Sequence, residues 1–434
     1  MVFDIVAYVA IALMLFLLFL VLFEPGIMYR ADPVDCEVAS DRFLCLLGAA
    51  TDAQVHRNST MQVFMGGEAF YAAELEAVRA AKQSIHIERF IFHPSDIADR
   101  YLDALCERAK AGVKVRLVVD WVGSFVTKDK YLDRLRQAGG QVAWYQPFRW
   151  YTFRRFNNRT HRELVVIDGR VGFIGGAGVA GHWSVGDGKG KPPWRDMMCR
   201  ITGDLVFGLQ SCFAENWIEC TGEILSQTAE FPSCDNTGES CPAPTEAAQD
   251  STRGVVIISA PSGGRTTRAR VLFQVLLASA RKSILINSPY FLPDRAARKQ
   301  LIEAAGRGVK VVVLMPGESN NHYFTRVASR RLYGQLLRGG IELHEFQPGM
   351  IHKKALVIDS AWSVVGSTNF DTRSFGINDE VNLAALDLNV ARQLEEHFAH
   401  ELSNSKKITL ALWEKRSLGE RILSLVGLFL QRQE

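Results

Sequence analysis

The residues of this sequence best suited to chemistry are two histidines, each of which opens a similar short motif. One motif runs from His161 to Asp168, and the other runs from His352 to Asp359. In each motif, charged residues after the histidine give way to a run of aliphatic residues that is typical of a buried strand. An imidazole can act as a nucleophile or exchange a proton near neutral pH, so both motifs are candidates for catalysis.

Lys354 stands two residues after His352, and the alternation of side chains along a strand predicts that the two share one face. An ammonium beside an imidazole suits attack on a phosphate, because the cation balances charge on the equatorial oxygens. A single H-x-K triplet is weak evidence, since most such histidines are structural. A related copy at an offset of 191 residues, from His161 to His352, makes the evidence strong.

The elements around the motifs also occur twice. In each copy a helix leads into a strand, and a later helix ends at a glycine and leads into a buried strand. The matched segments are 74–81 with 271–280, 84–92 with 283–291, and 111–120 with 307–316. The offset is 199 residues at Ser84 and 196 at Gly112, which indicates duplication. Alternating helices and strands predict an α/β fold with a mostly parallel sheet in each half.

These repeats and motifs together resemble the phospholipase D superfamily. The resemblance rests on H-x-K-x4-D in the second half and H-x-E-x4-D in the first, and it covers residues 60–400. Within the superfamily the sequence is most similar to bacterial cardiolipin synthases. The segments that carry this similarity are the apolar N-terminus, 88–92, 161–176, 194–196, 365–371 and 378–380.

The resemblance implies two α/β halves related by a pseudo-twofold axis, with both motifs at one active site between them. It implies that His161 is the nucleophile, which forms a phosphatidyl-histidine intermediate. His352 would protonate the leaving alkoxide and then deprotonate the incoming alcohol. Such an intermediate divides one difficult exchange into two easier steps. Neither a metal ion nor another cofactor is required.

Supporting roles around the histidines also follow from the resemblance. Each imidazole needs a carboxylate that fixes its tautomer. Asp196 and Glu380 follow the histidines of their own halves by 35 and 28 residues, where the family places such carboxylates. The other implied site residues are Lys354 and Asn369 as phosphate ligands, Arg195 and Ser367 as substrate contacts, and Asp168 and Asp359 as braces of the motif strands.

Glu163 is the clearest departure from the family, which has lysine at this position of the substrate site. Two unit charges about 4 Å apart interact by about 4 kcal/mol at an effective dielectric constant of about 20, so a reversed charge matters. Glu163 could pair with Lys354 and weaken or abolish catalysis, or it could be a deliberate inactivating substitution for lysine. Alternatively, Lys354 works with nearby arginines, namely Arg159, Arg162 or Arg195. Gly178, where many relatives carry asparagine, is a smaller departure.

Residues 144–162 contain five arginines, seven aromatic residues and no acidic residue. Arginines interleaved with aromatic residues suit the interface of a membrane with anionic headgroups. They also suit single-stranded nucleic acid. A partly buried aromatic segment with solvated arginines is the plain structural alternative. The apolar N-terminus favours lipid, and the segment leads directly into His161, where it could deliver an anionic lipid.

The nineteen residues 5–23 are all apolar, and Pro25 and Gly26 follow them closely. As a helix this run would be ~28 Å long, close to the hydrocarbon thickness of a bilayer. The first four residues contain no lysine or arginine, and no small-residue cleavage pattern follows, which argues against a secretory signal peptide. The sequence therefore predicts a retained transmembrane anchor, whose orientation is weakly specified because Arg30 is its one nearby basic residue.

The overall composition excludes several classes of protein. Hydrophobic residues make up 47% of the 434 residues and charged residues 22%, which excludes a disordered or collagen-like chain. The net charge of +3 is too balanced for a dedicated nucleic-acid-binding protein. Eight cysteines without a C-x2-C pair predict free thiols and no metal site, with a Cys234–Cys241 disulfide as the main exception.

The sequence thus predicts a membrane-bound phosphatidyltransferase. The expected domains are the anchor at 1–30, a first half at 53–226, a linker at 227–254, and a second half at 255–434 with an amphipathic helix at 418–429 that packs on the core or lies on a membrane. The resemblance implies that two phosphatidylglycerols give cardiolipin and glycerol at the bacterial cell membrane, with the catalytic halves on its cytoplasmic side.

The expected partners are phosphatidylglycerol, other anionic phospholipids and the membrane, and not nucleic acid. Two alternatives stay open. One is a hydrolase of the same fold, either a phospholipase D or a nuclease. The other is a catalytically weak lipid-binding protein, which Glu163 motivates.

Overall fold

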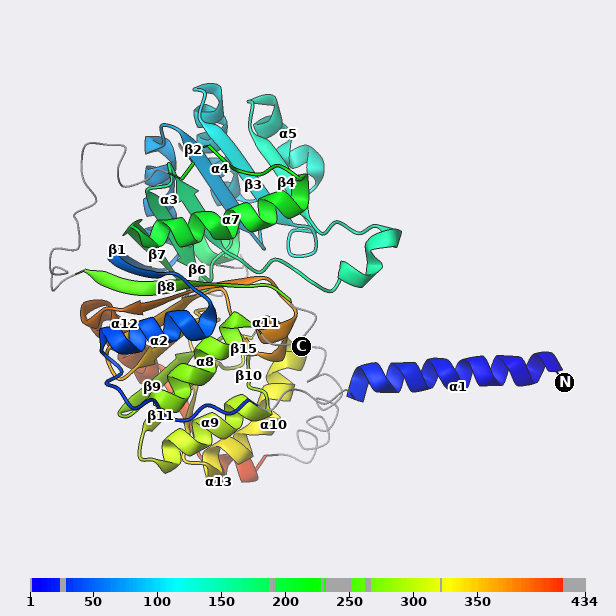
Figure 1. Cartoon of the computed structure of the whole chain (residues 1–434), viewed down its shortest axis with the longest axis vertical. Coiled ribbons are helices and arrows are strands. Elements are labelled where there is room, and N and C mark those ends of the chain that lie inside the picture. The colour runs from blue at the N-terminus through cyan, green and yellow to red at the C-terminus, as the bar shows by residue number, and fades with distance from the viewer. Residues whose placement is uncertain are drawn as a thin grey trace.

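The computed structural model of the chain describes residues 2–23, 29–186, 190, 192–227, 230–231, 251–261, 267–320 and 322–416. The expected amphipathic helix at 418–429, the Cys234–Cys241 pair and most of the expected linker lie outside these residues. Figure 1 shows two α/β bodies stacked on each other, with one long helix projecting to the side.

The first half contains seven strands and several helices in the described residues. Its strands are β1 (Val55–Met65), β2 (Ser84–Arg89), β3 (Lys114–Asp120), β4 (Gln141–Tyr145), β5 (Leu164–Ile167), β6 (Val171–Gly175) and β7 (Met197–Gly203). Its helices are α3 (Gly67–Ala80), α4 (Asp96–Lys110), α5 (Asp129–Gln137), the 3-10 helix η1 (Trp150–Arg155), α6 (Gly181–Ser184) and α7 (Leu205–Thr221).

The second half repeats this order of elements. Its strands are β8 (Thr252–Ser259), β9 (Ser283–Asn287), β10 (Phe291–Leu292), β11 (Lys310–Pro316), β12 (Glu342–Phe346), β13 (Ala355–Ile358), β14 (Trp362–Gly366), β15 (Phe370–Asp371), β16 (Glu380–Leu386) and β17 (Ser405–Ile408). Its helices are α8 (Arg268–Ser279), α9 (Arg295–Gly306), α10 (Tyr323–Arg338), α11 (Thr372–Gly376), α12 (Leu388–Ser403) and α13 (Leu410–Glu414). The expected glycine-ended helices are confirmed, because Gly112 and Gly308 adopt φ values of +87° and +89° after α4 and α9.

One sheet of fifteen strands runs through both halves, and its strand order is symmetric. Outward from the centre, the first half contributes β1, β7, β6, β5, β2, β3 and β4, and the second contributes β8, β16, β14, β13, β9, β11, β12 and then β17. The central strands β1 and β8 are antiparallel. Equivalent strands in the same order on both sides of an antiparallel pair are related by a pseudo-twofold axis, as expected.

The expectation of a mostly parallel sheet in each half is wrong. In the first half β2 and β4 pair in parallel with β3, and in the second β9 and β12 do so with β11. The strand within each histidine motif, β5 or β13, instead runs antiparallel to β2 or β9 and forms an antiparallel pair with the strand that follows it. Buried antiparallel strands are as continuously apolar as parallel ones, so hydrophobic periodicity does not distinguish them.

The hydrophobic core crosses the boundary between the halves. One buried cluster combines Phe213 and Trp217 of α7 with Leu383 of β16 and Leu394 of α12. Another takes Phe43 of α2 (Asp41–Thr51), a helix that precedes the first half in the chain, into the core of the second half. Because apolar packing is continuous across the boundary, the two histidine motifs are held in a fixed relation to each other.

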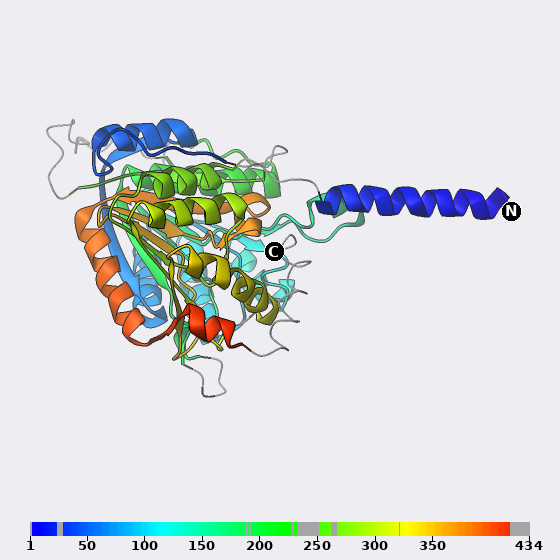
Figure 2. The same ribbon diagram turned by 90° about the horizontal axis from the view of Figure 1, so that it is seen from below.

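The apolar N-terminal segment forms α1 (Val2–Phe23), which extends away from both halves in Figures 1 and 2. Its apolar side chains between Ile5 and Phe16 are exposed. Across the described part of the chain, no helix is both long enough and apolar enough to cross a membrane. The helix is therefore present as expected, whereas the expected transmembrane span is not confirmed.

Candidate active site

Both histidines lie where the two halves meet, directly before β5 and β13. They sit in extended loops that lead into these strands, and not within the strands as expected. The backbone N–H of His161 donates to the carbonyl of Asp379 at 2.9 Å, and that of His352 donates to the carbonyl of Arg195 at 2.7 Å. Each histidine is therefore anchored to the backbone of the opposite half.

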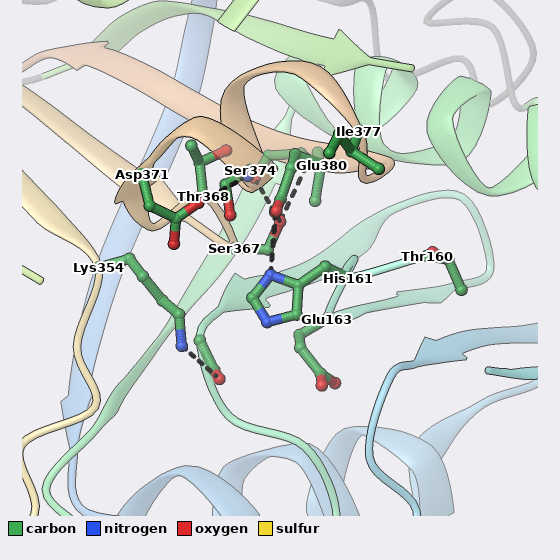
Figure 3. A network of polar contacts seen from close by, with 12 residues as sticks. Thr160, His161, Glu163, Lys354, Ser367, Thr368, Asp371, Ser374, Ile377 and Glu380 are labelled. Atoms are coloured by element: carbon green, nitrogen blue, oxygen red, sulfur yellow. Dashed lines mark hydrogen bonds and ion pairs between the residues drawn. The ribbon is translucent and has the colours of Figure 1, made fainter. Parts of the chain in front are cut away.

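Each imidazole is also paired with a buried carboxylate of the opposite half. His161 Nδ1 lies 3.1 and 3.2 Å from the two carboxylate oxygens of Glu380, as Figure 3 shows. His352 Nδ1 lies 2.8 Å from Asp196 Oδ2. From the resemblance we expected a carboxylate from the same half for each histidine, and this assignment is wrong. Asp196 precedes β7 and Glu380 begins β16, and these two strands flank the central pair of β1 and β8. Each carboxylate therefore lies close to the boundary and reaches the histidine of the opposite half.

Further hydrogen bonds hold the two carboxylates in place. Glu380 accepts from the hydroxyl of Ser367, so this serine, expected to contact substrate, supports the carboxylate. Asp196 accepts from the indole N–H of Trp183 at 3.1 Å and from the backbone N–H of Met197 at 2.9 Å. A fixed carboxylate at Nδ1 favours the tautomer with its proton there, which leaves Nε2 of each histidine for chemistry.

Lys354 lies beside His352, as the side-chain alternation predicted. Its ammonium nitrogen is 2.8 and 3.1 Å from the two ring nitrogens of His352, and in Figure 3 it points toward the first half, where the carbonyl of Gly176 is 3.4 Å away. Burial lowers the pKa of Lys354. Burial and the charge of Lys354 lower the pKa of His352 to about 4, against the opposing effect of Asp196. A neutral imidazole beside a buried cation can receive an anionic phosphate.

Asn369 is buried, and its side-chain oxygen has no hydrogen-bond partner within the described residues. Native proteins satisfy most buried polar groups, so an amide with unused hydrogen-bonding capacity is suited to a ligand. The three arginines considered as extra cations are engaged elsewhere. Arg159 lies 3.6 Å from Asp120, Arg162 pairs with Glu215, and Arg195 lies 3.6 Å from Glu401.

Glu163 is paired with Arg89 of β2. Of the alternatives considered for Glu163, the ion pair with Lys354 does not form within the described residues. The Arg89 guanidinium is fully buried, 3.5 Å from one Glu163 oxygen and 2.6 Å from a carboxylate oxygen of Glu74. The backbone N–H of Ile91 donates to the other Glu163 oxygen at 3.4 Å. The role of Arg89 was not predicted from the sequence. A cation at the end of a buried strand is nevertheless a signal that an acidic partner lies nearby.

Three corresponding positions distinguish the first copy from the second. Where the second copy has Ser288, Lys354 and Asn369, the first has Arg89, Glu163 and Gly178. A Cβ atom on Gly178 would lie 2.5 Å from the carbonyl oxygen of Ile91 and 3.1 Å from a carboxylate oxygen of Glu163. The three replacements fit one another. Arg89 is the cationic partner of Glu163, and the space next to Glu163 is too small for a side chain at position 178, so glycine is present there.

The titration of Glu163 gives a testable pH dependence of stability. Burial raises the pKa of Glu163 from 4.5 to about 8, although Arg89 opposes the shift. A carboxyl whose pKa is raised by folding contributes most stability below its unfolded pKa and loses it as the pH rises through the folded value. The melting temperature of Glu163→Gln relative to the unsubstituted protein should therefore increase between pH 5 and pH 8.5. A difference that does not vary with pH, measured by scanning fluorimetry, would contradict this.

The two motif aspartates lie at the ends of β5 and β13 that are away from the histidines. This position suits the expected bracing of the motif strands and does not suit contact with the substrate. The carboxylate of Asp168 accepts from the backbone N–H groups of residues 82–84 at 2.7 to 2.9 Å. Asp359 accepts from residues 281–283 over the same range of distances. Each aspartate thus ties the end of its motif strand to the start of β2 or β9.

Removing this brace is expected to affect stability and not chemistry. Asp168→Ala leaves three backbone N–H groups without their charged acceptor, which should cost about 3 kcal/mol of unfolding free energy. Asp168→Asn keeps an acceptor and tolerates the φ of +52° at this position, so it serves as the matched control. Urea unfolding measures the loss. A large fall in turnover of the folded protein, with stability unchanged, would instead place Asp168 in the chemistry.

Comparison with known proteins agrees with this architecture. Residues 75–182 and 274–402 match the family described as "Cardiolipin synthase, PLD-like domain". The chain is 32% identical over 386 residues to the probable cardiolipin synthase YwiE of Bacillus subtilis, covering 88% of this chain and 73% of that protein. It is 32% identical over 369 residues to the cardiolipin synthase of Alkalihalophilus pseudofirmus, covering 84% and 70%.

Solved structures of low sequence identity share the fold. Phosphatidylserine synthase of Haemophilus influenzae superposes with a TM-score of 0.66 at 13% identity, covering 89% of this chain and 97% of that one. Polyphosphate kinase of Porphyromonas gingivalis superposes with a TM-score of 0.53 at 11% identity, covering 86% and 53%. With both halves matched to one family and 32% identity to its members over most of their length, the chain belongs to the cardiolipin synthase family of phospholipase D-like proteins.

Proposed function

We propose that this protein is a phosphatidyltransferase that joins two phosphatidylglycerol molecules into cardiolipin and releases glycerol. The observation that carries the proposal is the pair of histidines from different halves, each held by a buried carboxylate of the other half, with Lys354 beside His352. The names of the relatives, cardiolipin synthases, support the choice of substrate. One phosphodiester replaces another, so the reaction needs no nucleotide.

In the first step, Nε2 of His161 attacks the phosphorus of one phosphatidylglycerol. A phosphorus–nitrogen bond forms, the bond to the headgroup glycerol breaks, and His352 gives its proton to the departing glycerol oxygen. The low pKa of His352 in the free protein reflects burial and the charge of Lys354. A bound phosphate offsets that charge, which raises the proton affinity of His352 when the acid is needed.

In the second step, the headgroup hydroxyl of another phosphatidylglycerol attacks the same phosphorus while His352 takes its proton. The phosphorus–nitrogen bond breaks, so His161 is regenerated and the phosphodiester of cardiolipin is complete. Lys354 and Asn369 hold phosphate oxygens in both steps. Because both histidines are buried, the site favours a positioned lipid alcohol over water, and transfer over hydrolysis.

The ion pair with Arg89 explains how the proposed site works with glutamate at 163. Arg89 lies 3.5 Å from this carboxylate and compensates its charge locally. The proposed site is therefore asymmetric: Lys354 supplies the charge for the phosphate, and the first half supplies the nucleophile.

We further propose that α1 attaches the protein to the membrane that contains its substrates. Its exposed apolar side chains support this, because such a surface is costly in water. A bilayer-resident substrate requires the enzyme to work at that surface. The cell membrane as the site of attachment, with the catalytic halves on its cytoplasmic side, stays a prediction.

Incubation of the full-length protein with phosphatidylglycerol vesicles tests the function, with lipids read by mass spectrometry. Cardiolipin and glycerol in equal amounts are expected. Phosphatidate without cardiolipin would overturn the proposal in favour of a phospholipase D-type hydrolase, and lipid binding without turnover would favour a lipid-binding protein. The variant His161→Asn controls for contaminating activity.

A further inference from the structure

The two copies differ in length directly before the histidine. Tyr145 ends β4 sixteen residues before His161, whereas Phe346 ends β12 six residues before His352. The first copy therefore carries ten extra residues at this point, and they include η1. We call residues 146–158 the η1 loop. Because the second half builds its motif without such an insertion, the fold does not require it.

The η1 loop exposes large aromatic side chains. Trp150 is 84% exposed, Tyr151 63% and Phe148 53%. Phe148 also packs on other rings: its ring lies 6.4 Å from that of Trp121 and 5.4 Å from that of Phe156. Large aromatic side chains that are exposed together on one loop mark a surface that a binding partner covers.

The charge of the η1 loop indicates an anionic partner. Residues 146–162 contain no aspartate or glutamate. Arg149 donates to the hydroxyl of Tyr151 at 2.9 Å, and the exposed Arg155 lies 4.0 Å from Glu219 of α7. Exposed tryptophan and tyrosine beside arginine form the combination that anchors proteins at the headgroup level of bilayers with anionic lipids.

The direction of the η1 loop favours a bilayer over a dissolved partner. In Figures 1 and 2 its teal ribbon projects from the first half on the same side as α1. Both α1 and the η1 loop therefore extend on one side of the molecule (Figures 1 and 2), and both carry exposed apolar or aromatic side chains. The chain passes from the loop directly into Thr160 and His161, so a surface that meets the loop also lies near the nucleophile.

We propose that the η1 loop is a second membrane contact, which inserts Phe148, Trp150 and Tyr151 at the headgroup boundary of an anionic bilayer and orients the active site toward it. The inference rests on the proposed function for the identity of the lipid substrate. With α1 as a tether and the η1 loop as a second contact, the catalytic halves are held in one orientation, and lipid headgroups enter the site directly from the bilayer.

Quenching of tryptophan fluorescence tests the insertion independently of turnover. The full-length protein is bound to vesicles of phosphatidylglycerol and a phosphatidylcholine brominated near the headgroup end of its acyl chains. A fraction of the emission should be quenched, and this fraction should disappear in Trp150→Phe but persist in Trp413→Phe, a matched change in α13. Equal quenching in Trp150→Phe and the unsubstituted protein would overturn the proposal, whether or not cardiolipin is formed.

Activity on two forms of the same lipid gives a second test. The double variant Trp150→Asp/Tyr151→Asp should make cardiolipin about tenfold more slowly from phosphatidylglycerol vesicles, because the loop no longer enters the interface. Its rate on short-chain phosphatidylglycerol dissolved as monomers should be unchanged. Leu388→Asp, at an exposed apolar position of α12 away from α1, is the control and should affect neither rate.

The outcomes separate the two proposals. Equal loss on both substrates would make the loop part of the catalytic site and overturn its role as a membrane contact. No turnover of either substrate by the unsubstituted protein would overturn the proposed function, while the quenching result would still stand. Single-stranded oligonucleotide binding that the double variant loses, with vesicle quenching intact, would also overturn the membrane contact.

Discussion

Replacing His161 by asparagine is expected to lower cardiolipin formation by about 10⁴-fold while the protein stays folded. A covalent route cannot proceed without its nucleophile, and removal of the nucleophile commonly costs this much or more. Asparagine can still donate a hydrogen bond to Glu380, so the buried carboxylate keeps a partner. The rate is measured on phosphatidylglycerol vesicles, with a thermal melt of each variant to establish that it is folded.

His352→Asn provides the comparison for this prediction. It removes a proton donor and acceptor and not the nucleophile, so a loss of about 10³-fold is expected. If His161→Asn kept more than a hundredth of the rate while His352→Asn lost all of it, the two histidines would have the opposite roles. A variant that loses its folded state loses activity for that reason alone. The thermal melts therefore accompany the rates, so that each rate is compared between folded proteins.

Replacing Glu163 by lysine, the residue of the family, is expected to damage the protein and not to repair it. The new ammonium would lie about as close to the buried Arg89 guanidinium as Glu163 does now, 3.5 Å away. Arg89 would keep Glu74 as its partner, but the new ammonium would be a buried charge without compensation, which costs about 3–5 kcal/mol. Urea unfolding should show this loss, and cardiolipin formation should fall with it.

A second change tests whether Arg89 is the cause. Arg89→Ser gives position 89 the residue that the second copy has at Ser288. In the double variant Arg89→Ser/Glu163→Lys, much of the stability lost in Glu163→Lys should return, which a double-mutant cycle expresses as a coupling energy. A Glu163→Lys protein that is as stable as the unsubstituted one and more active would contradict the account and identify Glu163 as an inactivating change.

The sequence predicted the parts of this site that follow a local pattern. Two motifs at one offset indicated the duplication, the side-chain alternation placed Lys354 beside His352, and the glycines at 112 and 308 marked the ends of helices. Each of these depends on residues close together in the chain. Local periodicity carries such information directly.

The parts that it did not predict depend on how distant segments meet. Asp196 reaches His352 across 156 residues, and Glu380 reaches His161 across 219. Which carboxylate serves which histidine is set by the antiparallel contact of β1 and β8, and no spacing within one half encodes that contact. The pairing of Glu163 with Arg89 was missed for the same reason, since a loop and a neighbouring strand bring them together.

The central claim is that His161 carries the phosphatidyl group between two lipids. Rapid denaturation of the full-length protein with detergent at neutral pH during turnover of phosphatidylglycerol, which preserves the acid-labile phosphorus–nitrogen bond, followed by proteolysis and mass spectrometry, tests this claim most directly. The account predicts a phosphatidyl adduct on the peptide that contains His161, and none on that peptide in His161→Asn. An adduct on the peptide of His352, or steady cardiolipin formation with no adduct at all, would contradict it.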